Sequence, residues 1–582
     1  MLLLFENDLK SIIPELFLVI SFVLLLLYGL FLSSSNEKSQ LQSYNIAFQN
    51  DTNINTNIRS LTGYQNFQLL TLNSSWISIL VLLLTCILLC NNPIGKILIF
   101  YNSFFLDDFS RFLKVLVVIG TALSILISFS YYQQERLNWY ELQTIICLSS
   151  SSLLFLISSV DFISIYLVVE LQSLCFYVLA GIKRDSEFST EAGLKYFLLG
   201  ALSSGLLLFG CGLIYGFTGL TYLSELSKIL QSQASGYPIL LDTSFEQLNN
   251  LSVHFNKEWG NSFSSFYELF SVQFSEIRNL DLGIIFILVG FLFKLTAVPF
   301  HTWAPDVYEG APTCITAYFA IVPKIAILGI LVRICYTCFY DSFLSVQKIL
   351  IVSSIGSMIL GSYAALSQNK MKRLLAWSSI GHVGFLLIAV CSGTVEGLQA
   401  LCVYLVIYLI MTINLFTLVL APLRREIITH GDGIEENRAS HQSFYSSKTN
   451  VKHIKYITDL SFLAKINPVL AITLTITMFS IAGIPPLAGF FSKAFLMFVA
   501  MSACQYILAI IAILTSVISC FYYIRLVKIM YFEKSKKQLF FVKQNKEISL
   551  VFGITFIFIL FFCLNPSSLF VCTHLSALQL SS

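Results

Sequence analysis

Charged residues are scarce in this sequence. Asp, Glu, Lys and Arg together make up 12% of its 582 residues, whereas ordinary soluble domains carry about 25%. Hydrophobic residues make up 56%, and a chain of this length with so little charge would expose large apolar areas in water. The scarcity of charge therefore excludes a soluble fold and indicates an integral membrane protein. Intrinsic disorder is excluded as well, because it needs low hydrophobicity and high charge.

A basic excess and the common cofactor motifs are also missing. The net charge is only +3, so the chain has no charge to neutralise many phosphates, and nucleic-acid binding is excluded as its main function. The sequence holds no P-loop, haem-attachment motif, zinc site or nucleophile elbow. The 14 cysteines are scattered, and the single C-x-x-C at Cys335 and Cys338 lacks a second pair. We therefore expect the chain to bind no cofactor and no metal.

Long apolar runs are abundant. A membrane crossing needs roughly 20 apolar helical residues, and the sequence contains runs for about fourteen of them. We therefore predict an all-α polytopic membrane protein, in which the polar stretches 33–73, 222–280 and 424–465 are loops. The predicted spans lie near 11–32, 74–91, 110–132, 142–160, 161–182, 192–218, 282–303, 313–335, 346–367, 374–393, 396–421, 467–503, 506–530 and 548–572.

The distribution of basic residues predicts the orientation. Most loop lysines and arginines follow odd-numbered spans, as at Lys183, Arg184, Lys370 and the cluster 534–537. By the positive-inside rule these loops face the cytoplasm or the matrix. Both termini are then predicted on the opposite side, which requires an even number of spans.

Five lysines fall within predicted spans, where a charge costs about 2.5–3.5 kcal/mol at the bilayer centre. Lys114 and Lys195 lie close to span ends. For Lys114 we favour a side chain that reaches the interface. Lys195 has two simple explanations: its side chain reaches the interface in the same way, or it forms an ion pair with Glu191 one turn earlier.

Lys294 and Lys324 lie at mid-span, and Glu170 is the only carboxylate that we place equally deep. A buried lysine near a carboxylate can load and release a proton when the carboxylate moves or is neutralised. The alternative is a static ion pair that clamps helices together. Because mid-span charges recur along the chain, we favour a chain of titratable groups.

Two predicted spans are interrupted by proline and glycine. Pro299 follows Lys294, and the segment 483–489 holds two glycines and two prolines ahead of Lys493. Broken helices at membrane depth are tolerated where they line a hydrated cavity, and corresponding breaks in two halves indicate inverted repeats. We predict two inverted five-helix repeats with broken helices 7 and 12. The expected organisation is a three-helix segment 1–132, repeats 142–335 and 346–530, and a last helix 548–572.

Two histidines lie near membrane depth. His301 is next to the first break, so we keep it as a possible relay residue beside Lys294. His382 lies in an apolar helix, where a histidine is more often hydrogen-bonded to a neighbour. The glycine-rich run Gly210–Gly216 lies inside an apolar helix, where small residues favour close helix packing over nucleotide binding.

Several long blocks resemble a known family, the subunit 2 proteins of mitochondrial NADH:ubiquinone oxidoreductase, which is respiratory complex I. The resemblance runs through the spans from end to end. The blocks are V-E-L-Q-S-L-C-F-Y-V-L-A-G-I-K-R at 169–184, S-E-F-S-T-E-A-G-L-K-Y-F at 186–197, F-K-L-T-A-V-P-F-H-T-W-A-P-D-V-Y-E-G-A-P-T at 293–313, K-R-L-L-A-W-S-S-I-G-H-V-G at 372–384 and G-I-P-P-L-A-G-F-F-S-K at 483–493.

The resemblance implies an antiporter-like membrane-arm subunit of the mitochondrial inner membrane, with both termini on the intermembrane-space side. It implies partners among the other membrane-arm subunits and lipids, while NADH, FMN, iron–sulfur clusters and ubiquinone bind elsewhere in the assembly. A stand-alone or multi-subunit cation/proton antiporter and a structural helix-bundle scaffold remain alternatives. The relay residues that the resemblance implies are Glu170, Lys195, Lys294, Lys324 and Lys493, with His301 beside the first break.

Overall fold

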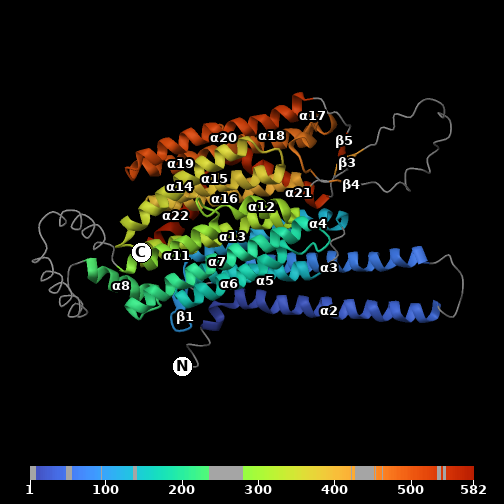
Figure 1. The fold of residues 1–582 in the computed structure, drawn as a ribbon, viewed down its shortest axis with the longest axis horizontal. Coiled ribbons are helices and arrows are strands. Elements are labelled where there is room, and N and C mark those ends of the chain that lie inside the picture. Colours follow the sequence, from blue (N-terminus) through green and yellow to red (C-terminus); the bar gives the residue numbers. More distant parts are fainter. Residues whose placement is uncertain are drawn as a thin grey trace, which may run out of the picture.

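The computed structural model is a bundle of long helices that run side by side (Figure 1). Among the described residues, twelve helices are long and apolar enough to cross a membrane, which confirms the all-α membrane class. The predicted count of about fourteen spans stays a prediction. The structure describes residues 8–47, 56–92, 95–135, 140–234, 279–420, 423–425, 451–452, 454–461, 463–533, 539–541 and 546–581.

Within the described ranges, most neighbouring helices are joined by short connections. Apolar runs bounded by Gly, Pro, Asn or Asp produce most of them. They are α2 (Ile13–Ala47), α3 (Thr56–Cys90), α4 (Asp108–Gln134), α5 (Tyr140–Ser158), α6 (Phe162–Ala180), α7 (Glu187–Thr218), α8 (Leu223–Ala234), α11 (Asn279–Leu295), α12 (Trp303–Gly310), α13 (Thr313–Arg333), α14 (Phe343–Leu366), α15 (Met371–Cys391), α16 (Val395–Val419), α17 (Leu463–Ile466), α18 (Pro468–Ala482), α19 (Ala488–Ser502), α20 (Tyr506–Phe532), α21 (Lys546–Phe561) and α22 (Ser567–Ser581).

Short strands and turns close the ends of the bundle. Strands β1 (Ile97–Ile99) and β2 (Phe104–Leu106) form an antiparallel hairpin, with Leu98 opposite Phe105. Strand β3 (Leu423–Arg425) pairs antiparallel with both β4 (Val451–Lys452) and β5 (Leu539–Phe541). The remaining short segments are a π-helical turn at Ile334–Cys338 and 3-10 turns at Ile457–Leu460 and Phe562–Leu564.

The polar segment 33–73 is mostly helical, which contradicts the predicted loop. Helix α2 continues to Ala47 and α3 already begins at Thr56. Residues 33–47 contain neither proline nor glycine, so nothing stops the helix after its apolar part ends. Polarity alone was therefore a poor signal for a loop.

The other predicted boundaries are partly wrong. Helix α8 occupies the start of the predicted loop 222–280, and residues 235–278 lie outside the described part. The predicted loop 424–465 contains short strands and turns at its edges, and its residues 426–450 also lie outside. The last predicted helix, 548–572, is divided into α21 and α22, because Pro566 lacks the N–H that a continuing helix needs.

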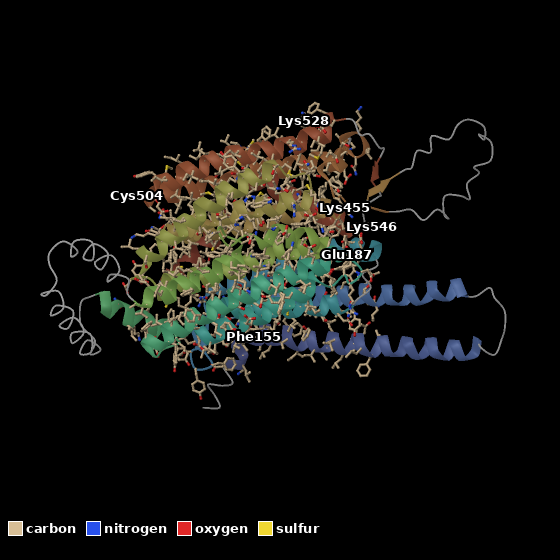
Figure 2. The ribbon with its side chains drawn as sticks, viewed as in Figure 1. Phe155, Glu187, Lys455, Cys504, Lys528 and Lys546 are labelled. Carbon is tan, nitrogen blue, oxygen red and sulfur yellow. The ribbon has the colours of Figure 1, made fainter. Side chains whose placement is uncertain are left out.

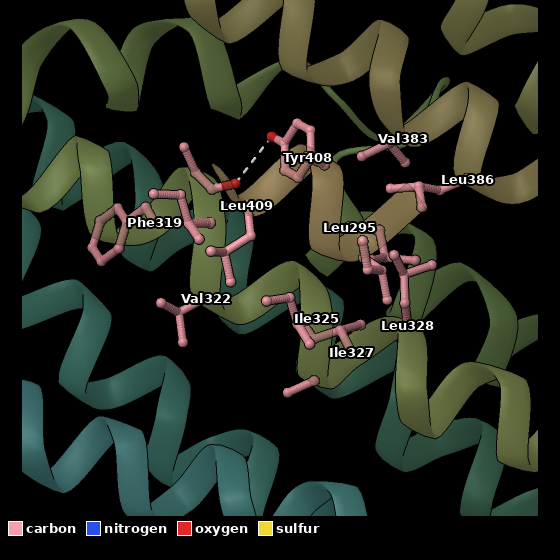
Figure 3. Packing of buried hydrophobic residues seen from close by; sticks show 14 of the residues in the cluster. Leu295, Phe319, Val322, Ile325, Ile327, Leu328, Val383, Leu386, Tyr408 and Leu409 are labelled. Carbon is pink, nitrogen blue, oxygen red and sulfur yellow. Dashed lines mark hydrogen bonds between the residues drawn. The ribbon is translucent and has the colours of Figure 1, made fainter. Parts of the chain in front are cut away.

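Helix α13 lies at the centre of the bundle. All of its residues are buried, and it packs against α4, α5, α11 and α16. Figure 3 shows apolar side chains of α13, among them Val322, Ile325 and Leu328, surrounded by side chains of neighbouring helices. The outer face of the bundle is apolar too, as the exposed side chains of Ile507 and Val517 in α20 show. This outer face suits contact with lipid or with other membrane helices.

The two ends of the bundle differ in charge. Both ends of the described chain lie at the same end of the bundle, next to the β1–β2 hairpin. Asp8 accepts a hydrogen bond from Phe100 N (3.3 Å), and Gln579 accepts one from Asp108 N (2.8 Å). We call this end of the bundle the terminal end. Figure 2 shows Lys455, Lys528 and Lys546 at the opposite end, which we call the basic end.

Candidate functional site

Both predicted helix breaks are present. Helix α11 ends at Leu295, Thr296 has φ +65°, and α12 begins only at Trp303. Helix α18 ends at Ala482, followed by Gly483 with φ +91°, and α19 begins at Ala488. Each break leaves backbone carbonyls at the end of the first half-helix without partners from their own helix.

Lys493 interacts with the second break. Its Nζ donates hydrogen bonds to the carbonyl oxygens of Ile481 (2.7 Å) and Ala482 (3.2 Å). An ammonium at this place also interacts favourably with the negative, C-terminal end of the helix dipole of α18. The Phe385 ring lies 5.2 Å from Nζ and covers it from another side. Lys493 is therefore buried with its donors satisfied by the broken backbone.

Lys294 occupies the corresponding place in α11 but differs in its contacts. It is buried in the last turn of α11, and its Nζ has no hydrogen-bond partner among the described residues. The ring of Tyr177 lies 5.9 Å from it, and the charge of Glu170 acts on it. Glu170 accepts a hydrogen bond from the Ser173 hydroxyl at Oε2 (3.1 Å), while its buried Oε1 has no partner. Glu170 and Lys294 are thus two charged groups with hydrogen-bonding capacity unused.

Lys324 lies in the middle of α13 and is 1% exposed. Its Nζ donates to the Ser379 carbonyl and to the Tyr408 hydroxyl, each at 3.4 Å. The Tyr408 hydroxyl in turn donates to the Ala320 carbonyl at 3.1 Å, the bond drawn in Figure 3. The two long contacts hold the ammonium only weakly, because N–H···O bonds are strongest near 2.9 Å.

Three small cavities lie beside these lysines and their neighbours. One borders both Lys294 and Lys324, a second borders Ser379, Tyr408 and His382, and a third borders His382 and Lys493. Each has a volume of about 20 Å³, which is enough for about one water molecule. Each cavity is lined by polar groups from at least two helices, so water-sized sites lie beside each of the three lysines or beside their hydrogen-bond partners.

His382 has more contacts with this region than the sequence indicated. It is buried in α15, and its Nδ1 forms a hydrogen bond with the Tyr404 hydroxyl at 2.7 Å, as the sequence had indicated. It also borders two of the three cavities, and the charges of Lys324 and Lys493 both act on it. The available signal was the polar face of α15, on which Ser378 and Ser379 precede His382 by one turn.

Lys195 and His301 lie outside this series. Lys195 has a side chain that is 44% exposed and pairs with Glu191 (2.6 Å) and Asp306 (3.2 Å) toward the basic end. The predicted contact with Glu191 is therefore present. His301 is half-buried, with its ring 5.4 Å from that of Trp377. The relay roles of both residues stay predictions.

The interpretation of Lys114 was wrong. Its side chain is 1% exposed and does not extend to the protein surface, because its Nζ pairs with Glu15 Oε1 at 2.5 Å. Its partner Glu15 is also 1% exposed but lies in the first turn of α2, so the placement of Glu170 at mid-span stays a prediction. The partner lies 99 positions away in the sequence, so no local pattern could reveal it.

Comparison with known proteins identifies the family. Residues 159–519, more than half of the chain, match the family described as NADH:quinone oxidoreductase/Mrp antiporter, TM. NADH-ubiquinone oxidoreductase chain 2 of Marchantia polymorpha is 45% identical over 99% of this chain and 100% of that relative. NADH-quinone oxidoreductase subunit N 1 of Rhizobium meliloti is 40% identical over 79% of this chain and 82% of that relative.

Solved structures share the fold. A chain of respiratory complex I from Thermus thermophilus with bound aureothin superimposes with a TM-score of 0.63 at 23% identity, covering 86% of this chain and 94% of that one. A chain of the Mrp complex from Dietzia superimposes with a TM-score of 0.67 at 15% identity, covering 99% and 98%. The family match and the identity of the relatives over nearly the whole length agree, so the chain belongs to the NADH:quinone oxidoreductase/Mrp antiporter transmembrane family.

Proposed function

We propose that the chain is a core membrane-arm subunit of a proton-translocating NADH:ubiquinone oxidoreductase and relays protons through Glu170, Lys294, Lys324 and Lys493. The observation that carries the relay is that three water-sized cavities lie beside three buried lysines, with Lys324 bonded to Ser379 and Tyr408 between the first cavity and the second. The names of the relatives over nearly the full length support the assembly. His382 joins the proposal because it borders the two cavities between Lys324 and Lys493.

The relay begins with Glu170 and Lys294. A buried ammonium is costly unless a counter-charge or hydrogen bonds stabilise it. Nζ of Lys294 has no hydrogen-bond partner among the described residues, so the carboxylate of Glu170 and the ring of Tyr177 are what stabilise it. When a proton neutralises Glu170, Lys294 loses that stabilisation and passes its own proton into the cavity shared with Lys324. Reprotonation of Lys294 and loss of the proton from Glu170 restore the first state, so no other reactant is needed.

The redox chemistry belongs to other subunits in this proposal. NADH, FMN, the iron–sulfur clusters and ubiquinone bind there, and this chain responds to changes that reach it through the membrane arm. Its expected partners are the other membrane-arm subunits and membrane lipids.

The chain is a multi-pass protein of the mitochondrial inner membrane, as its mitochondrial relatives and apolar spans indicate. We infer that both termini face the intermembrane space. The common terminal end supports this orientation, and so do the lysines at the opposite end.

We also infer two inverted five-helix repeats, at 142–335 and 346–530. The first would run from α5 to α13 with α8 as an insertion, and the second from α14 to α20. The broken helix is fourth in each: α11 and α12 in the first, α18 and α19 in the second. An odd number of helices per unit requires the two copies to be inverted.

Replacement of Lys294 by Met and of Glu170 by Gln in the assembled complex tests the relay. We expect each variant to assemble but to pump protons at least about tenfold more slowly, because a positioned proton-transfer group contributes about 10²- to 10⁴-fold. The measurements are native-gel assembly, NADH oxidation and proton uptake by closed vesicles. Lys348→Met is the control, since Lys348 is an exposed lysine of α14. Normal pumping in both variants would favour a structural scaffold.

The antiporter alternative has a separate test. The Mrp chain shares the fold at 15% identity, which does not distinguish the two functions. A subunit of the oxidoreductase must migrate in native gels with an assembly that oxidises NADH. A chain found only outside that assembly would instead act as an antiporter.

A further inference from the structure

A second group of buried charges lies in the first helices, apart from the relay series. Lys114 of α4 pairs with Glu15 of α2, and both side chains are 1% exposed. Lys114 lies six residues after the start of α4 at Asp108, about 9 Å along the helix axis. The pair is therefore buried close to the terminal end of the bundle.

A second buried ion pair adjoins it. Nη2 of Arg333 donates to both carboxylate oxygens of Asp107, at 2.8 and 3.0 Å, and both side chains are at most 3% exposed. Arg333 is the last residue of α13, the helix that also carries Lys324. Nine residues separate the two, about 13 Å along the axis. Helix α13 thus connects the relay series to the terminal end.

A polar cavity lies between the two pairs. Glu15, Lys114 and Asp107 border it together with Ser11 and Asn92. Its volume is about 20 Å³, which again suits about one water molecule. Oε2 of Glu15 is buried and has no hydrogen-bond partner among the described side chains and backbone. An ion pair that served only as a clamp would have no need for an unpaired carboxylate oxygen beside a polar cavity.

We propose that Glu15, Lys114 and this cavity form a proton-binding site at the terminal end of the bundle. The ligand is a proton carried by water. A proton from the cavity binds Oε2 of Glu15 and gives the neutral acid. Lys114 remains an ammonium because it keeps its hydrogen bond to Oε1, whereas Lys294 has no hydrogen bond to hold its proton when Glu170 is neutralised. Release of that proton to water at the terminal end restores the carboxylate. The inference rests on the proposed function, because it supplies a release site for the relayed protons.

The double variant Glu15→Gln with Lys114→Gln tests the site in the assembled complex. It removes both titratable groups but keeps side chains of similar size that can hydrogen-bond to each other. We expect the complex to assemble and its proton release per NADH oxidised to fall severalfold, with a limit of about 10²- to 10⁴-fold for a proton-transfer group. An assembled double variant with unchanged pumping would overturn the inference.

A measurement on the unmodified complex covers the case in which the double variant does not assemble. An apolar carbodiimide reacts with protonated carboxylic acids, and mass spectrometry locates the adduct. We expect an adduct on Glu15 during NADH oxidation, which would support the site even without the variant. No adduct, together with failed assembly, would show a clamp and overturn it. Lys294→Met separates this inference from the relay. Normal pumping in the Lys294→Met variant would contradict the relay. Lost pumping in that variant, together with normal pumping in the double variant, would contradict only the terminal site.

Discussion

At the scale of single residues, the two lysines beside the helix breaks differ in how firmly they are held. Lys493 donates to two carbonyls of α18, whereas Nζ of Lys294 has no hydrogen-bond partner among the described groups. A hydrogen bond from a charged donor contributes about 1.5–3 kcal/mol. Lys493 should therefore keep its position more strictly, and Lys294 should respond more readily to a change at Glu170.

The position of Lys493 depends on Gly483. A Cβ on Gly483 would lie 3.2 Å from Cδ of Lys493, and the residue has φ +91°. We predict that Gly483→Ala displaces the lysine from the carbonyls of Ile481 and Ala482 and lowers the pumping rate. The backbone strain of alanine at this positive φ destabilises the folded chain by about 1–2 kcal/mol. Proton uptake by vesicles and native-gel assembly measure the two effects.

Gly219 offers a matched control for the backbone strain. It has φ +70°, and a Cβ there would meet nothing within 4 Å. Gly219→Ala therefore carries a similar strain without touching a relay residue, and its pumping per assembled complex should stay normal. Equal losses in the two variants would mean that strain, and not Lys493, explains the effect.

How far single residues could be predicted depends on whether their partners are local. Lys294, Lys324 and Lys493 stand out in apolar helices, because an ionisable side chain within the membrane is costly and rarely occurs without a function. The pair of Lys114 with Glu15 and the position of His382 between two lysines arise from tertiary packing. No spacing in the sequence encodes either contact.

At the scale of helices, glycines allow α7 to approach α11, the helix that carries Lys294. Gly210 of α7 faces Gly283 and Ile287 of α11, and a Cβ on Gly210 would lie 2.9 Å from the Gly283 carbonyl oxygen. The predicted role of the glycine-rich run in packing is thus present at Gly210. Gly212 and Gly216 of the same run have no such neighbour within 4 Å.

We predict that Gly210→Ala separates α7 from α11 and destabilises the subunit. Overpacking costs about 1–3 kcal/mol, and here the obstacle is backbone that cannot move aside. Gly212→Ala is the control, because its Cβ enters open space and a helical alanine gains up to about 1 kcal/mol over glycine. The amount of assembled complex after mild heating checks both. Similar amounts from the two variants would argue against a packing role for Gly210.

Helix existence was easier to predict than helix ends. Apolar runs of about 20 residues located the spans, and the residue pattern located both breaks. The end of α2 was missed, because the polar residues 33–47 contain neither proline nor glycine, and the start of α3 was missed as well. Pro566 was visible in the sequence, but its effect on the last predicted helix was overlooked.

At the scale of the whole molecule, the difference between the two ends fixes a testable orientation. Cys504 is exposed between α19 and α20, and Lys455 is exposed at the opposite end, as Figure 2 shows. If the basic end faces the matrix, as the positive-inside rule requires, Cys504 faces the intermembrane space.

A membrane-impermeant maleimide can test this orientation in vesicles of both polarities. We predict that Cys504 is modified in mitoplasts, whose intermembrane-space surface is accessible, and is protected in inverted inner-membrane vesicles. In a Cys504→Ser background, Lys455→Cys should show the reverse pattern, and peptide mass spectrometry separates these sites from the other cysteines. Modification of both sites from the same surface would contradict the arrangement of the ends. An exact reversal would leave the fold intact but would require protons to leave at the basic end, so Glu15 would then lie on the uptake side of the relay.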